Sequence, residues 1–424
     1  MPHSLTTLQA ILDDLRAPLQ NIIGTKTRAL SWAEKSPLTG GGKQVLQPVI
    51  VADDTGHGWI TDGGVLAAAA GGDPLQLTVP YRFFAGRFRI TGPTIDAAGE
   101  GNSQLENAVQ FSMERLVAGV TSSLNRFTWS GNRTLGFINE HEVKLANRLW
   151  EFTGDAQKVA DLITANGGAP ITVDVVNMAT YATIGAVTLS AADVTGSRVT
   201  VVQALDTAAA GVPGFAHALR CTNAGLGLEN QMTGIYENMG APIHFGANRT
   251  TAAGTALLQS NVLTLATAGA HDRGDINLQR VQQLLDRISV RTRNEGRPTR
   301  AFFHPTARAE ISTLFQGATT MQLNVGGGGG LKVDGGIMPG GFSYGGIPFE
   351  EDVDCARGGI FFVQDDTWST YMMRGGDWDG DVYNFQGTDA VERVWKQYFN
   401  LGCYGPNFAG AIVGLDFDGA VAGT

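Results

Sequence analysis

The segment from Leu75 to Asn132 constrains the fold more than any other, because it predicts a long ribbon that leads into one long helix. Residues Leu75–Phe83 alternate apolar and polar side chains at a period of two, which is the pattern of a strand with one buried face. Gly86 allows a turn, and Arg87–Ile90 would then start back as a second strand. The sequence therefore predicts an extended ribbon in front of the helix.

A capping box marks the start of the helix. Ser103 can accept a hydrogen bond from one free helix amide, and Glu106 can reach back to another. We expect the helix to end near Arg126, after about 36 Å at ~1.5 Å per residue. Its apolar side chains form one stripe, at Leu105, Val109, Met113, Leu116, Val117, Val120 and Leu124. Because little nearby sequence can cover the ribbon, the pattern indicates a chain that packs against copies of itself.

The composition is that of a globular protein with an unusually uncharged surface. Of 424 residues, 43% are hydrophobic and 17% are charged, against about 25% charged in typical domains. This length can bury a substantial core and predicts more than one domain. The net charge of −10 comes without the basic stripe of a dedicated nucleic-acid binder. If the chain encloses DNA, it does so without sequence-specific binding.

Cysteine usage and hydropathy indicate an intracellular chain. Cys221, Cys355 and Cys403 lie far apart without metal-ligand spacing, which favours reduced, buried thiols. The first Lys or Arg is Arg16, and no apolar run approaches the ~18 residues of a membrane span. We therefore expect neither a signal peptide nor a contact with membranes.

The remaining segments alternate between helical and β patterns. Residues Leu5–Leu15 predict a short amphipathic helix that needs an apolar partner surface, because so short a helix is marginal alone. From Gly136 to Gly227 the signals are β, interrupted by a helical pattern at Ala156–Asn166. Further downstream we expect a helix from about Asp275, a strand at Ala301–Phe303, a helix at Pro305–Leu314, and strands at Gly359–Val363, Trp368–Met373 and Val391–Leu401.

Motifs that could carry chemistry lack required residues. Gly40–Lys43 misses the first Gly of a phosphate loop, and His141–Leu145 has Leu145 where a zinc-protease helix needs its second His. Asp377–Asp381 could offer carboxylates to a hard cation, but Thr388 stands where an EF-hand loop has its Glu. We interpret that cluster as a solvated turn between strands. The sequence predicts no enzyme, no cofactor and no metal site.

Several segments resemble the major capsid proteins of tailed bacteriophages. Gly86–Ala98 and the helix after it resemble the ribbon and helix of that family. Arg297–Pro305 is similar to the strand and helix of its axial domain, and Gly345–Phe349 resembles the segment before the next strand. Val391–Asn407 resembles its closing strand.

The resemblance implies an α+β class, Hong Kong 97-like capsid fold with an N-terminal arm, an extended β-hairpin loop, a long spine helix, a peripheral β domain and an α/β axial domain. The arm would span residues 1–36 and the extended loop 37–92. The peripheral domain would span 93–260, with the spine helix at 103–126. The axial domain would follow at 261–365, and returning strands at 366–424. Residues 146–221 fit least well, as either an enlarged peripheral domain or a β insertion.

The resemblance also implies a function. The chain would assemble with itself, as hexamers and pentamers, into an icosahedral virion capsid around double-stranded DNA, in the cytoplasm of a host bacterium. Portal and scaffold proteins, with a decoration protein as an optional addition, would be partners. The expected inter-subunit contacts lie in the arm and the ribbon, at Leu8, Ile11, Leu15, Trp59, Tyr81, Arg82, Phe83, Arg87, Phe88 and Arg89.

Lysine positions bear on how such a shell would be held together. Some members of the family lock the shell with a Lys–Asn bond from the extended loop. Lys43 is the only lysine between Ser36 and Glu142, and the loop tip Asp53–Trp59 has none. We therefore expect a non-covalent shell. The alternatives are an encapsulin-like compartment, which shares the fold, and a β-rich hydrolase using acids of the Asp377–Asp381 cluster.

Overall fold

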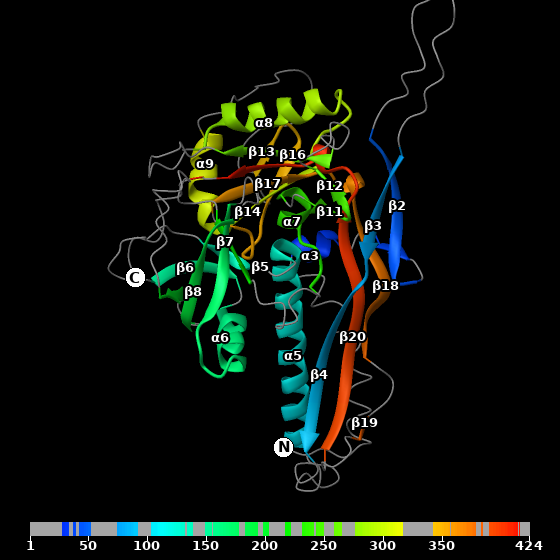
Figure 1. Cartoon of the computed structure of the whole chain (residues 1–424), viewed down its shortest axis with the longest axis vertical. Helices are drawn as coiled ribbons and strands as arrows, with labels where there is room; N and C mark the ends of the chain where they lie inside the picture. The colour runs from blue at the N-terminus through cyan, green and yellow to red at the C-terminus, as the bar shows by residue number, and fades with distance from the viewer. Residues whose placement is uncertain are drawn as a thin grey trace, which may run out of the picture.

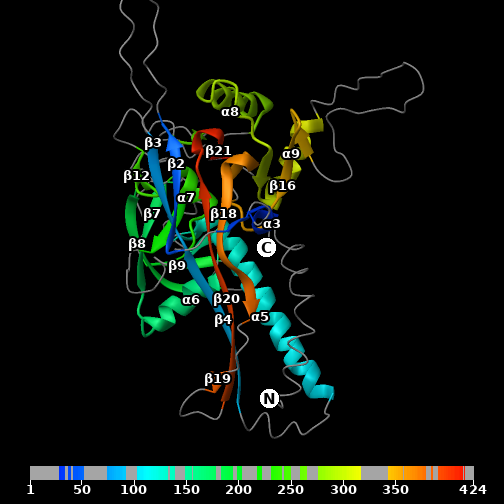
Figure 2. The same ribbon diagram turned by 90° about the vertical axis from the view of Figure 1, so that its right-hand side faces the viewer.

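The structure is a computed structural model of an elongated molecule. It describes residues 28–33, 37–39, 42–51, 74–91, 103–131, 134–138, 149–154, 156–177, 183–193, 198–202, 217–221, 231–240, 243–249, 258–264, 276–316, 342–356, 358–378, 383–384, 390–413 and 415. Helix α8 (Leu278–Arg291) lies at one end of the molecule. The far end of the long helix α5 (Ser103–Ser130) lies at the other (Figures 1 and 2).

Helix α5 begins at Ser103, as predicted, but continues one turn past the predicted end at Arg126. The cause is Trp129, which is completely buried and packs against two phenylalanine rings. Its ring centroid lies 5.6 Å from that of Phe302 and 5.3 Å from that of Phe361. These partners are more than 170 positions away in the chain, so no local pattern could show that the helix extends to them.

Two glycines allow backbone segments to approach closely around α5. Gly131, just after the helix, has a φ of +51°, and a Cβ there would lie 2.1 Å from the backbone nitrogen of Gly234. The turn predicted at Gly86 is wrong, because strand β4 (Arg82–Thr91) runs straight through that residue. A Cβ at Gly86 would lie 3.3 Å from a methyl of Val120 in α5. This glycine therefore serves helix–strand packing rather than chain reversal.

Strand β4 belongs to a long mixed sheet that lies alongside α5 (Figure 1). Ten residues of β4 pair in antiparallel register with the long strand that is second to last in the chain, from Arg82 opposite Phe399 to Thr91 opposite Ala390. The alternation of its side chains sends Phe84 toward α5, where its ring lies 6.0 Å from that of Phe127. The other strands of the long sheet are β1 (Pro37–Thr39), β18 (Trp368–Trp378), β19 (Tyr383–Asn384) and β20 (Ala390–Cys403).

The ribbon before β4 forms a separate two-stranded hairpin. Strand β2 (Gln44–Ile50) pairs in antiparallel register with β3 (Pro74–Pro80), with Val45 opposite Val79. We call these two strands the extended hairpin. It stands along one side of the molecule, and the chain enters the long sheet only after β3 (Figure 1). The hairpin partner of β3 is thus the preceding strand, not the segment after Gly86.

The region that follows α5 contains a closed six-stranded barrel. Its strands follow the order β10-β5-β6-β9-β8-β7, and all the pairs are antiparallel. Helix α6 (Ala156–Ala165) packs against it and contributes Val159 and Leu162 to a core of its own. The strands are β5 (Thr134–Ile138), β6 (Leu149–Gly154), β7 (Ile171–Asn177), β8 (Thr183–Asp193), β9 (Arg198–Val201) and β10 (His217–Cys221).

A six-stranded sheet with helices against it forms the end marked by α8. Its order is β13-β21-β17-β14-β16-β15. Asn277 caps α8 by accepting a hydrogen bond from the Arg280 amide at 2.8 Å, two residues later than the predicted start at Asp275, which lies outside the described residues. The strands are β13 (Asn261–Thr264), β14 (Arg300–Phe303), β15 (Phe342–Tyr344), β16 (Ile347–Glu351), β17 (Gly359–Val363) and β21 (Gly410–Val413). The short helix η4 (Pro305–Ala307) leads into α9 (Arg308–Gln316).

Short elements join these parts around a central core. The core gathers apolar side chains from α5, from both large sheets and from helix α3 (Arg28–Ala33), in which Leu30 is fully buried. A small hairpin of β11 (Ile243–His244) and β12 (Ala247–Asn248) follows helix α7 (Ile235–Gly240). Two further short helices are η5 (Asp365–Thr367) and η6 (Pro406–Phe408).

Candidate assembly interface

The extended hairpin exposes apolar side chains to solvent. Along β2 the side chains alternate between exposed and partly covered, so that one face looks outward. On that face Leu46 is 49% exposed and Ile50 is 74% exposed. The opposite face turns toward the body, where Val45 and Val49 pack against small clusters. Within the described residues β2 pairs only with β3, so its outer edge carries no partner strand. Exposed apolar groups beside a free strand edge are typical of an interaction surface.

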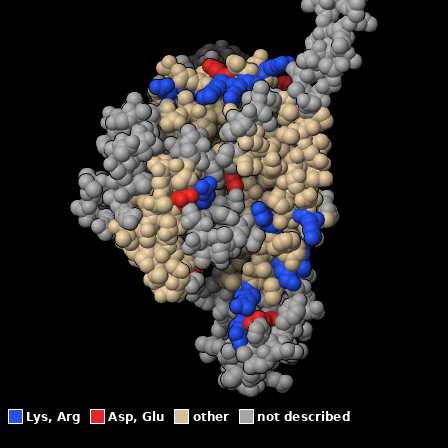
Figure 3. Space-filling view, viewed as in Figure 1, with Lys and Arg blue, Asp and Glu red and all other residues tan. Residues whose placement is uncertain are grey.

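A second exposed surface lies on the outer face of β4 and β20. Phe83 is 63% exposed, and its ring stacks edge-on against Tyr398 with centroids 4.9 Å apart. Arg87 and Arg89 follow on the same face at the period of two, both exposed. Arg89 pairs with Glu392 of β20 at 3.5 Å. Lys and Arg side chains run down the side of the molecule on which β4 and β20 lie (Figure 3). This face combines aromatic and cationic groups.

Two residues predicted as inter-subunit contacts face inward. Tyr81 is 3% exposed and packs with Val79 and Tyr371, so it is covered by its own chain. This corrects its predicted role, because a buried ring has no surface left for a neighbour. Arg82 is partly buried, and its Nε has no hydrogen-bond partner. Burial lowers the pKa of Arg82, and the charge of Glu237 opposes that shift. Its charge is thus directed toward the subunit interior.

The other predicted contacts lie outside the described residues, entirely or in their side chains. The arm residues Leu8, Ile11 and Leu15 and the loop residue Trp59 lie outside the described residues. The backbone of Phe88 pairs with Arg393 in the long sheet, but its side chain lies outside the described part.

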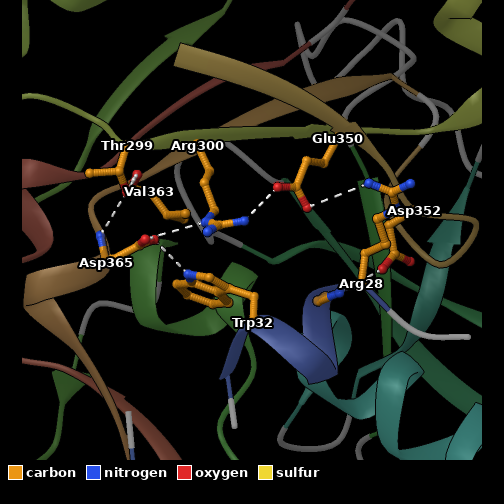
Figure 4. A network of polar contacts seen from close by, with 9 residues as sticks. Arg28, Trp32, Thr299, Arg300, Glu350, Asp352, Val363 and Asp365 are labelled. Atoms are coloured by element: carbon orange, nitrogen blue, oxygen red, sulfur yellow. Dashed lines mark hydrogen bonds and ion pairs between the residues drawn. The ribbon is translucent and has the colours of Figure 1, made fainter. Parts of the chain in front are cut away.

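Sequence reasoning did not find the network that anchors α3 (Figure 4). The Trp32 indole donates a hydrogen bond to Asp365 at 2.7 Å, and Asp365 also pairs with Arg300 at 3.3 Å. Arg300 in turn pairs with Glu350, which lies 3.9 Å from Arg28. The partners come from β14, β16 and η5, far from α3 in the chain. The only local signal was an isolated Trp in a short helix.

Asp352 ties α3 to the long helix. One carboxylate oxygen accepts the Ala29 amide at 3.0 Å, and the other accepts Asn125 Nδ2 at 3.0 Å and the Asp354 amide at 2.9 Å. Burial raises the pKa of Asp352, while these hydrogen bonds act in the opposite direction. Helix α3 is therefore held in the centre of the subunit.

Metal ligands, buried cysteines and apolar helices bear on the alternative functions. Across the described ranges, no cluster of His, Cys, Asp and Glu has the geometry to hold a metal ion. Asp377 lies in β18, where it pairs in register with Lys396, and not in the predicted turn. Residues 379–381 of that turn lie outside the described residues. Burial raises the pKa of the Cys403 thiol to about 12, so this buried cysteine is a neutral core residue. Among the described helices, none is long and apolar enough to cross a membrane.

Comparisons with known proteins identify the fold. No protein-family model matches the sequence, and no curated protein matches it. Among solved structures, the chain is similar to the capsid asymmetric unit of cyanophage A-1(L), with a TM-score of 0.53 at 10% identity over 91% of each chain. It also matches the capsid of a native GTA particle, with a TM-score of 0.47 at 9% identity over 90% of this chain and 88% of the other. A third match is the SrpI encapsulin of Synechococcus elongatus, with a TM-score of 0.41 at 8% identity over 94% and 92%. The chain has the α+β fold of a phage capsid protein.

Proposed function

We propose that this chain is the major capsid protein of a tailed bacteriophage, and that it assembles as hexamers and pentamers into an icosahedral shell around double-stranded DNA. The observation that carries the proposal is the shared fold over 91% of both chains with a cyanophage capsid subunit. The extended hairpin supports it, because Ile50 and Leu46 are exposed in the single subunit. Assembly into a shell requires a subunit whose exposed apolar side chains become buried against neighbouring subunits.

In this proposal each part of the fold has a place in a Hong Kong 97-like subunit. The extended hairpin is the core of the extended loop, and α5 with the long sheet forms the peripheral domain. The six-stranded sheet with α8 and α9 is the axial domain. The barrel at 134–221 is an insertion after the spine helix, and α3 anchors the N-terminal arm.

The proposed contacts between subunits join the two exposed surfaces. Phe83, Arg87 and Arg89 offer an aromatic and cationic face. The segment 44–80 has no Lys or Arg and carries four carboxylates, at Asp53, Asp54, Asp62 and Asp73. The four carboxylates lie outside the described residues. Opposite charges on two segments of one chain favour head-to-tail association, which can close into rings. The arm residues Leu8, Ile11 and Leu15, together with Trp59 and Phe88, complete the proposed contacts.

The energetics suit a shell that corrects its own errors. Apolar burial stabilises by about 25 cal/mol per Å², so a few hundred Å² per contact contribute several kcal/mol before association costs. Each contact is then weak enough to reverse, while many contacts per subunit hold the closed shell. Lys43 is exposed at the root of the extended hairpin, far from the tip in sequence, and we infer that the shell is non-covalent.

Expression of the full chain tests this function directly. Negative-stain microscopy should show closed shells or capsomer rings, and a dilute monomer without higher assemblies would count against the proposal. Double-stranded DNA within particles purified from infected cells supports the phage assignment, whereas enclosed protein cargo would favour the encapsulin-like alternative. A ladder of covalent multimers on a denaturing gel would contradict the non-covalent shell. Portal and scaffold proteins, and a decoration protein where present, should co-purify with assembly intermediates.

A further inference from the structure

The turn between β11 and β12 places a bulky residue in a strained backbone conformation. His244 pairs with Ala247, so Phe245 and Gly246 form a two-residue hairpin turn. Their φ values are +46° and +91°, the signature of a type I′ turn, which Asn-Gly normally occupies. A phenylalanine at positive φ is a rare and costly choice. Such a residue persists only where its side chain or backbone makes compensating contacts.

Phe245 makes those contacts with the extended hairpin. Its carbonyl oxygen accepts a hydrogen bond from the Thr78 amide of β3 at 3.0 Å. Its ring is partly buried between two small apolar clusters, one around Leu77 and the other around Val79 and Tyr371. Both clusters include side chains of β3, so the turn touches the inner edge and the inner face of the hairpin together.

The other side of the β11–β12 hairpin is fixed to the body. The His244 Nε2 lies 2.6 Å from the carbonyl oxygen of Cys403 in β20. The buried guanidinium of Arg249 donates to the carbonyl oxygens of Asn238 at 2.7 Å and of Leu258 at 3.1 Å. The β11–β12 hairpin, residues 243–248, thus forms a rigid strut between β20 and β3.

The base of the extended hairpin, where the chain enters β2 and leaves β3, has features of a hinge. On one strand Gly42 has a φ of +97°, and no heavy atom lies within 4 Å of the position that a Cβ would occupy. On the other strand Tyr81 separates β3 from β4, and its amide donates to the Lys43 carbonyl oxygen at 3.3 Å. A cavity of about 230 Å³ lies beside this base, lined by Thr78, Arg82 and the strut. The hairpin therefore has a pivot point at Gly42 and adjacent space. The strut is one of the contacts that oppose its rotation, together with the hydrogen bond that Asn400 Nδ2 donates to the Pro80 carbonyl oxygen at 2.8 Å.

We propose that Phe245 is a positioning residue that sets the angle between the extended hairpin and the body of the subunit, and through it the curvature of the assembled shell. The first part stands on the contacts of the single subunit. The second part rests on the proposed function, because only an assembling subunit transmits this angle to its neighbours.

The test compares Phe245→Gly with a matched core variant, Phe349→Ala, in the full chain. Glycine is compatible with the type I′ turn and removes the whole side chain. Phe349 is 4% exposed in the distant cluster around α8 and the six-stranded sheet. In Phe245→Gly, amide hydrogen exchange of β2 and β3 should accelerate at least about tenfold, with exchange in β14 and β17 unchanged. Phe349→Ala should accelerate exchange in β14 and β17 and leave β2 and β3 protected. Phe245→Leu should restore most of the protection, because it keeps apolar bulk at the turn.

Particle diameter distinguishes a positioning role from a purely stabilising one, because substitution of a residue that only stabilises the subunit would not change the diameter. Phe245→Gly should give shells of mixed diameter or open sheets, while Phe349→Ala shells keep the wild-type diameter. The positioning role would be overturned if the exchange rates of β2 and β3 in Phe245→Gly equalled those of the wild type. It would also be overturned if Phe349→Ala accelerated exchange in β2 and β3 as much as Phe245→Gly does. Uniform wild-type shells from Phe245→Gly would overturn its role in curvature. If the wild type itself forms no shells, the proposed function fails, and the exchange comparison still decides the role of the strut.

Discussion

The exposed face of the extended hairpin gives the sharpest prediction about assembly. Leu46 and Ile50 are 49% and 74% exposed in the single subunit. Full burial of such a side chain stabilises by about 1.5–3 kcal/mol. In proportion to its exposed fraction, Ile50 has about 1–2 kcal/mol still to gain on a neighbour, and Leu46 has about 1 kcal/mol. Their loss should weaken each subunit contact about 30- to 150-fold, since each 1.4 kcal/mol is a factor of ten.

The variant Leu46→Asp with Ile50→Asp tests this estimate. Because only the covered fractions of the two side chains stabilise the single subunit, its free energy of unfolding should fall by no more than about 1–2 kcal/mol in total. Light scattering should show a critical concentration for assembly raised by at least about 30-fold, while far-UV circular dichroism stays that of the wild type. Val290→Asp is the matched control, because Val290 is 78% exposed on α8, where no contact is proposed. Assembly of the double variant at the wild-type concentration would refute the reasoning.

Further predictions concern the stability of the single subunit, measured by chemical denaturation. Tyr81→Phe should leave the free energy of unfolding within about 1 kcal/mol of the wild type or raise it, because the buried hydroxyl has no partner, whereas Tyr81→Asp should lower it by at least about 3 kcal/mol. An equal effect of the two changes would contradict the burial of Tyr81. Gly131→Ala should destabilise by about 2 kcal/mol or more, because φ is +51° and the Cβ would meet Gly234, while Gly119→Ala, in an open helical position, should stabilise by up to about 1 kcal/mol. Burial lowers the pKa of His244 from 6.5 to about 3, so the unfolded chain binds a proton that the folded one does not, and stability should fall as the pH drops below 6.5. His244→Gln should flatten this dependence, and an unchanged slope would argue against the assignment.

Local patterns predicted the long helix and the central strands of the fold. The capping box and apolar stripe located α5, and continuous apolar runs located β14 and β17, because helix capping and side-chain periodicity act between residues close in sequence. The same reasoning failed at Gly86, which allows a turn but serves close packing against Val120. A glycine has the same local signature in both roles, and only the neighbouring helix distinguishes them.

For the candidate interface, too, local patterns predicted part of the structure and tertiary contacts decided the rest. Alternation along the ribbon correctly indicated two faces but could not say which side chains the chain itself would cover. Tyr81 and Phe83 look alike in sequence, yet Tyr81 is 3% exposed and Phe83 is 63% exposed. The difference arises because Tyr81 packs in one cluster with Tyr371, which comes from a distant part of the chain, and Phe245 packs against the same cluster. The role of Phe245 could not be predicted from the sequence, because its backbone strain and its contact with Thr78 exist only in the folded subunit.

The sequence by itself determined that this chain has a long helix, a ribbon of alternating side chains and a resemblance to phage capsid proteins, because these depend on residue order over short distances. Only the tertiary structure decided which strand pairs with which, where α3 is anchored and which faces remain free. Pairing β4 with β20, some 300 positions apart, and closing a barrel at 134–221 depend on the summed packing of distant segments. Exposure is a property of that packing, so the surfaces available to another copy could be read only after the chain had folded.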